Sequence, residues 1–183
     1  MSRADQRRWR SARTLADLAD LTALWLQGRI ASQPGYEPGQ GPDAETRPLI
    51  PALTALNRAG ILTTDSQPGH RPEHGWDHAA YAQREAVSIL APRAAADRIA
   101  AAARAAGLLT TLGGREQIPV TTRNGTPVTW LGRVHGPTLR ATWKPVGPDA
   151  LTAVTSAVPL AVAGPEYAPC PRLWEILSRE AGR

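Results

Sequence analysis

Most of the residues that could do chemistry lie in a polar stretch behind a short apolar run. Residues 61–64 predict a buried strand, and residues 65–78 follow it with prolines and glycines that disfavour a helix. Loops at the end of a strand often carry function, because their backbone and side-chain groups are free to meet a ligand. We therefore expect a ligand site where residues 65–78 meet an earlier loop around Tyr36.

The candidate ligand-binding residues combine hydrogen-bonding, cationic and aromatic side chains. They are Tyr36, Arg58, Asp65, Ser66, Gln67, His70, Arg71 and Trp76. Ser66 and Gln67 would form hydrogen bonds to the ligand, His70 and Arg71 would face negative charge, and an aromatic ring would close over it. The alternative is a plain chain reversal, because Asp and Ser side chains bond their own backbone and Pro-Gly completes a turn.

Three of the four histidines fall in the same stretch. His70, His74 and His78 are spaced by four residues, and Asp77 stands beside the last of them. Imidazole and carboxylate groups bind zinc and similar ions, so these four residues are the candidates for a metal site. The alternative, which we adopt, is that the histidines are solvated on a surface loop and that the domain needs no metal and no cofactor.

An enzyme is the second functional hypothesis. A hydrolase or transferase could use Ser66 as its nucleophile and His70, His74 or His135 as the base, with or without a metal. No Gly-x-Ser-x-Gly motif surrounds Ser66, so the sequence alone does not order these residues into a catalytic triad.

The N-terminal segment suggests a third hypothesis, which is binding of nucleic acid. Residues 1–13 hold five arginines and one aspartate, a net +4 out of the +5 of the whole chain. Arg7, Arg8, Trp9 and Arg10 combine positive charge with an aromatic ring, a pattern typical of contacts with phosphates and bases. We expect residues 1–12 to be a flexible basic arm, and the alternative is a solubilising tail.

Composition limits the class of protein. The apolar share of 42% is that of a folded protein, and the single cysteine, Cys170, excludes an intrachain disulfide. No apolar run is long enough to span a bilayer, and the N-terminus lacks the apolar core of a signal peptide. We therefore expect a cytoplasmic protein without membrane contact, whose partner is a small molecule or another protein.

Hydrophobic spacing and turn residues predict the secondary structure. Helices are predicted from residues 11–14 to 28, from 43–46 to 60, and over 92–106, 148–156 and the stretch from 171 onward. Strands are predicted at 61–64, 108–111, 118–122, 128–134 and 139–143. Asn124-Gly125 joins two of these strands as a tight hairpin. Residues 81–90 fit a helix or a strand, and the alternation within 85–90 favours a strand.

The predicted order of elements defines the fold class. Helices and strands do not alternate strictly, which favours an α+β fold with a mixed, largely antiparallel sheet and helices mainly on one face. Two helices lie at the N-terminal side and one at the C-terminus. No long Gly/Ser or charged linker divides the chain, so we expect a single α+β domain over residues 13–183, behind the arm of residues 1–12.

Several short motifs are similar to those of an uncharacterised actinobacterial domain family. They are Trp25-Leu26-Gln27-Gly28, Leu56-Asn57-Arg58-Ala59-Gly60 and Thr63-Thr64-Asp65-Ser66-Gln67-Pro68-Gly69. The resemblance covers residues 15–110, about half of the chain. It implies membership of that family and no particular activity.

Overall fold

A first antiparallel sheet lies at the centre of the molecule, with its strands in the order β1-β4-β8-β5. Its strands are β1 Leu62–Gln67, β4 Ala86–Ala91, β8 Val158–Ala163 and β5 Leu109–Leu112. The computed structural model describes residues 1–182, and each neighbouring pair in this sheet runs antiparallel. The predicted α+β class is confirmed.

A second sheet of four strands, in the order β2-β3-β6-β7, packs behind the first. Its strands are β2 His70–His74, β3 Ala80–Gln83, β6 Ile118–Arg123 and β7 Thr126–Leu131. The predicted hairpin is confirmed as β6 and β7, and Asn124 and Gly125 adopt the positive φ angles that its tight turn requires. Two antiparallel sheets therefore stand where one mixed, largely antiparallel sheet was predicted.

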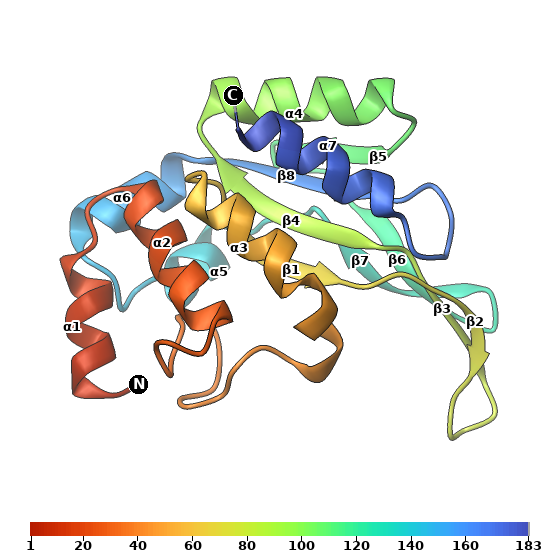
Figure 1. Ribbon diagram of the computed structural model, residues 1–183, viewed down its shortest axis with the longest axis horizontal. Coiled ribbons are helices and arrows are strands. Elements are labelled where there is room, and N and C mark those ends of the chain that lie inside the picture. The colour runs from red at the N-terminus through yellow and green to blue at the C-terminus, as the bar shows by residue number, and fades with distance from the viewer. Residues whose placement is uncertain (183) are drawn as a thin grey trace.

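Most of the helices cover the other side of the first sheet, whereas α5 lies behind this sheet, on the side of the second sheet (Figure 1). The helices are α1 Arg3–Ser11, α2 Leu15–Leu26, the 3-10 helix η1 Ala44–Leu49, α3 Ile50–Arg58, α4 Arg93–Ala105, α5 Gly136–Thr142, α6 Pro148–Ser156 and α7 Pro171–Ala181. The predicted start of α2 is confirmed, because Thr14 and Asp17 form a reciprocal capping box. No helix within residues 1–182 is both long and apolar enough to cross a bilayer.

The alternation of side chains along β8 shows how the layers pack. Leu160 and Val162 lie in the core beneath the helices, whereas Ala161 and Ala163 pack against the second sheet. Both faces of β8 are therefore buried, so its residues form a continuous apolar run and not a polar–apolar alternation. No strand was predicted here, because the pattern lacks the period of two and includes Pro159.

Three further sequence predictions need correction or completion. Residues 139–143 are not a strand, because Leu139 and Trp143 lie one helical turn apart within and after α5, while Ala141 between them is exposed. The expected loop over residues 65–78 is largely extended, since β1 continues to Gln67 and β2 begins at His70. The ambiguous residues 81–90 are strands, namely most of β3 and of β4.

The N-terminal segment, for which a flexible basic arm was predicted, forms a helix that packs on the core. Trp9 of α1 is fully buried, its indole Nε1–H donates to the carbonyl of Ser32 at 2.8 Å, and its ring meets that of Trp143 edge-on. Asp5 is also buried, and it accepts hydrogen bonds from the backbone of Ala31 and the side chain of Arg8. The many arginines of this segment did not predict a packed helix, because only two residues of α1 are buried.

Candidate functional site

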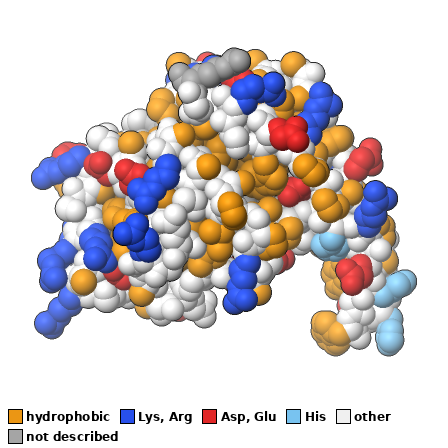
Figure 2. All heavy atoms as spheres, in the orientation of Figure 1, with side chains coloured by type: hydrophobic (Ala, Val, Ile, Leu, Met, Phe, Trp, Pro, Cys, Tyr) orange, Lys and Arg blue, Asp and Glu red, His pale blue; other side chains and the backbone are white. Residues whose placement is uncertain are grey.

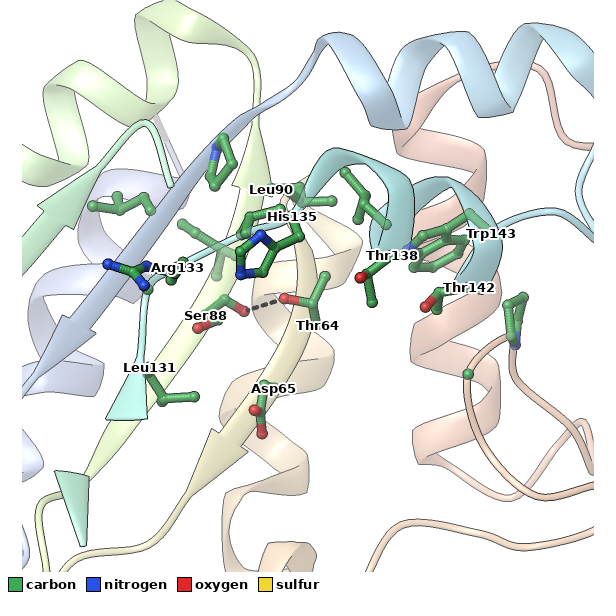
Figure 3. A pocket seen from close by; sticks show the side chains of 18 of the residues that line it. Thr64, Asp65, Ser88, Leu90, Leu131, Arg133, His135, Thr138, Thr142 and Trp143 are labelled. Atoms are coloured by element: carbon green, nitrogen blue, oxygen red, sulfur yellow. Dashed lines mark hydrogen bonds between the residues drawn. The ribbon is translucent and has the colours of Figure 1, made fainter. Parts of the chain in front are cut away.

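The main candidate site is a cavity of about 370 Å³ between the first sheet and α5. Its apolar walls come mainly from Leu90, Leu131, Val134, Leu139, Trp143 and Pro159. Its polar groups belong to Gln33, Tyr36, Thr64, Asp65, Ser88, Arg133, His135, Thr138 and Thr142 (Figure 3). Five separate segments of the chain meet at this one hollow, and the volume is within the range of small-molecule pockets.

The floor of the cavity is formed by β1 and β4. Asp65 pairs with Ser88 in the antiparallel register, so their side chains lie side by side on the same face. The register shifts between Thr63 and Asp65, which marks a β-bulge at Thr64. The bulge allows two successive residues, Thr64 and Asp65, to line the same cavity, and the Thr64 hydroxyl donates to the carbonyl oxygen of Ser88 at 3.2 Å.

The wall opposite this floor is formed by α5 and the segment that leads into it. His135 is the N-cap residue of α5, and Pro137 occupies the first turn, where a missing N–H costs nothing. Thr138 and Thr142 are four residues apart and therefore share one face of the helix, which lines the cavity. In Figure 3 the imidazole of His135 lies over Thr64 and Ser88.

A third wall is the loop at residues 33–36, and α1 holds it from behind. The bond from Trp9 to the carbonyl of Ser32 fixes the chain immediately before Gln33. At the other end of this wall, Gly35 approaches α5 so closely that a Cβ would lie 2.8 Å from the Cγ2 of Thr142. Its φ of +89° also favours glycine.

The charge is negative on the side of the cavity formed by the 33–36 loop and Asp65, which we call the loop side. Burial by the surrounding protein raises the pKa of Asp65 although solvent reaches the carboxylate, and Glu45 and Asp43 raise it further, against a backbone hydrogen bond from Ser66 that lowers it. Burial, followed by the charges of Asp65 and Asp43, raises the pKa of Tyr36. Within residues 1–182, none of these three carboxylates forms an ion pair.

A smaller cavity of about 20 Å³ adjoins the main one and shares Gln33, Tyr36, Thr64 and Asp65 with it. This volume is sufficient for one water molecule. Gln33 is only 5% exposed, and its amide oxygen is buried with no hydrogen-bond partner among the residues described. An acceptor buried in this way favours a donor beside it.

The structure separates the residues that sequence reasoning grouped together on β1. Asp65 and Tyr36 line the main cavity, whereas Ser66 lines only the smaller one. Gln67 is buried, and its amide nitrogen donates to the carbonyl oxygens of Arg84 and Val120, so it links the two sheets. Successive residues of a strand point to opposite faces, which is why these neighbours have different surroundings.

The other predicted ligand-binding residues lie away from the cavity. Arg58 forms an ion pair with Asp20 on the helical surface, with 3.0 Å between the charged atoms. His70 and Arg71 belong to β2, and Trp76 is 96% exposed at the tip of the β2–β3 hairpin. This hairpin projects from the body of the protein, and Figure 2 shows histidine side chains along it.

The four metal candidates do not form a ligand set. In residues 1–182 no group of three or more His, Cys, Asp or Glu side chains is placed to hold a metal ion. The Nδ1 of His74 meets the carbonyl oxygen of His78 at 3.1 Å, within the hairpin. Asp77 pairs instead with Arg123 at 2.8 Å, and this hydrogen-bonded cation lowers the pKa of the carboxyl.

The basic N-terminal residues also differ from their predicted setting. Trp9 is buried, so its ring is not free to stack on a base, and Arg8 pairs with Asp5. Arg7 and Arg10 remain exposed on the surface of α1.

Sequence reasoning missed most of the polar groups of the cavity, namely Gln33, Thr64, Ser88, Arg133, Thr138 and Thr142. Asp65 and Tyr36 were predicted as ligand-binding residues, whereas His135 was considered only as a possible base for Ser66, and these last two residues line different cavities. One local signal was present: a proline in the first turn followed by residues spaced by four predicts a short helix from Gly136. No local signal links that helix to β1.

Comparison with known proteins identifies the family. Residues 4–181 match the family described as Domain of unknown function (DUF6919), so the chain belongs to that family. The match includes nearly all of α1, the eight strands described above and α7, and it confirms the expected membership of an uncharacterised domain family. A search of curated proteins found no match.

Proposed function

We propose that this domain binds a small organic molecule in the cavity between β1, β4 and α5. The observation that carries the proposal is the cavity itself, whose 370 Å³ combine apolar walls with polar side chains from several segments of the chain. Apolar walls supply affinity by burial, while a small number of polar groups orient the ligand, and this combination is typical of ligand pockets.

The geometry supports binding better than the Ser66-based chemistry considered from the sequence. Ser66 and His135 do not line a common cavity, so the hydroxyl and its suggested base are not neighbours. The loop histidines His70, His74 and His78 lie on or beside the β2–β3 hairpin, and none of them lines the main cavity.

The proposal can be tested with a fragment library and a variant that fills the cavity. Thr138→Phe places a ring in the cavity from an exposed position of α5, and Ala141→Phe adds the same ring to α5 outside the cavity lining. A ligand at a hundred times its Kd stabilises the protein by about 2.7 kcal/mol. For a chain of this size, that corresponds to a rise in Tm of roughly 5–11 °C.

We expect at least one fragment to raise the Tm of the wild type and of Ala141→Phe, but not that of Thr138→Phe. Chemical shift changes in NMR spectra should then appear at the indole N–H of Trp143, which lines the cavity. Fragments that bind all three proteins equally would show that the cavity is not the binding site.

A further inference from the structure

The polar atoms of the 33–36 and Asp65 side of the cavity that lack a cation or a donor are hydrogen-bond acceptors. The Asp65 carboxylate faces the cavity without a cation, and the amide oxygen of Gln33 is buried without a donor. Gln33 is more than nine-tenths buried. Both Gln33 and Asp65 line the main cavity and the smaller one. A group that suits this end of the cavity is therefore rich in N–H or O–H donors.

The charges at this end favour a donor that is also a cation. Asp43 and Glu45 lie close enough to act on Asp65 electrostatically, and they add negative charge to its side of the cavity. The basic side chains that line the cavity are Arg133 and His135, both from the segment between β7 and α5, and neither forms an ion pair with Asp65. The negative potential around Asp65 is therefore not neutralised by a neighbouring side chain.

An aromatic ring adjoins the same acid. Tyr36 lines both cavities, and its ring packs on that of Trp25 with 4.5 Å between the ring centroids. The indole N–H of Trp25 donates in turn to the carbonyl oxygen of Gln40 at 3.0 Å, which holds the aromatic pair against the loop. A carboxylate beside an aromatic ring is a favourable environment for an organic ammonium group.

We infer that the ligand of this cavity carries a protonated amine, which binds at Asp65 beside Tyr36 and Gln33 while its apolar part lies along Leu90, Leu131 and Trp143. This inference rests on the proposed function, because it concerns the same cavity. It names a ligand class, an organic amine of small-metabolite size, that the family match does not assign.

The inference predicts how affinity depends on pH. A cationic amine binds the deprotonated Asp65, so affinity falls as the pH is lowered through the raised pKa of this carboxyl. Asp43 and Glu45 raise the pKa of Asp65 beyond the effect of burial. The other titratable or charged groups that line the cavity are Tyr36 beside Asp65, and Arg133 and His135 in the segment that leads into α5. Asp65→Asn should remove the part of the pH dependence that follows the carboxyl.

Three probes with one shared apolar body provide the test. Phenethylamine is cationic at neutral pH, phenethyl alcohol is neutral, and 3-phenylpropionate is anionic. Their Kd values are measured by calorimetry or NMR titration against the wild type, Asp65→Asn, Glu37→Gln and Thr138→Phe. Glu37→Gln is the matched control, because it removes an exposed carboxylate of the neighbouring loop that does not line the cavity.

We expect the amine to bind about tenfold or more tightly than the alcohol, because a hydrogen bond to a charged group is stronger than one between neutral groups. Asp65→Asn should remove this preference, Glu37→Gln should keep it, and Thr138→Phe should abolish binding. If the alcohol or the propionate binds as tightly as the amine and Thr138→Phe abolishes that binding, the amine assignment is overturned while the proposed binding function stands. If no probe binds, the amine assignment alone is overturned, because the fragment screen tests the cavity independently. If Thr138→Phe leaves binding intact, both are overturned.

Discussion

Trp9 offers the sharpest test of the N-terminal part of the structure. A flexible basic arm would tolerate any substitution at this position, whereas the structure buries the Trp9 ring completely and ties its indole N–H to the Ser32 carbonyl. The substitution Trp9→Phe keeps an aromatic ring but removes the donor and part of the volume. Comparing the stability of the wild type and of this variant therefore distinguishes a flexible arm from a packed helix without deleting α1.

The expected cost follows from two losses. The carbonyl of Ser32 loses its buried donor, which costs about 1–3 kcal/mol. The smaller ring also weakens the edge-on contact with Trp143, whose ring centroid lies 6.1 Å away, by roughly 1 kcal/mol. The sum is roughly 2–4 kcal/mol, a large part of the 5–15 kcal/mol that stabilises a typical domain.

Urea unfolding followed by far-UV circular dichroism measures this cost without depending on tryptophan emission. A loss of 2–4 kcal/mol lowers the Tm of a chain of this size by roughly 4–16 °C. Arg7→Ala is the control on the same helix, because Arg7 is exposed, and its cost should stay within about 0.5 kcal/mol. Equal unfolding midpoints for Trp9→Phe and the wild type would refute the packing of α1 described above.

Three further substitutions test other parts of the structure. Asp65→Asn should stabilise the free protein at neutral pH, because burial raises the pKa of this carboxyl. The gain in the free energy of unfolding should shrink as the pH falls through the raised pKa and vanish below the usual value of 3.8. Urea titrations at several pH values measure this dependence. Glu85→Ala leaves two donors at the start of α7 without their buried acceptor, so the free energy of unfolding should fall by about 1–3 kcal/mol in the same assay. Gly69→Ala places a Cβ on the carbonyl oxygen of Ala168 and should lower the Tm by several degrees, whereas Gly41→Ala, which meets open space, should not; equal effects of the two would contradict the close approach at Gly69.

Asp65→Asn is expected to change stability and ligand preference in opposite directions. The substitution is expected to raise the stability of the free protein and to abolish preference for an amine. Groups that lower stability while serving a ligand are concentrated at functional sites, because the ligand supplies the compensating interaction. Loss of both stability and binding in Asp65→Asn would instead assign the carboxylate a structural role.

Local patterns in the sequence were sufficient for many elements. The capping box at Thr14 and Asp17 defines the start of α2, and Asn124-Gly125 defines the β6–β7 turn, because both depend on residues close together in the chain. The same kind of local information predicted a strand at residues 139–143, although the spacing of Leu139 and Trp143 fits a helix as well. Tertiary packing selected the helix, with Trp143 buried beside Trp9.

The candidate site depended on contacts that no local pattern records. Asp65 and Tyr36 were predicted and do line the cavity, but their partners there come from β4, the end of β7 and α5. The sequence also placed Ser66, Gln67 and His70 in one polar group, although alternation along the strands and the change from one sheet to the other send them to different surroundings.

The sequence by itself determined the α+β class, the amphipathic helices and the hairpin, since hydrophobic period, caps and turn residues act over a few neighbours. Only the tertiary structure decided that β8 is a central strand, that α1 is anchored by Trp9, and that Asp65 lies in a cavity beneath α5. The physical reason is that burial on both faces of a strand, and the meeting of segments far apart in the chain, are properties of the packed layers and leave no periodic trace in any one segment.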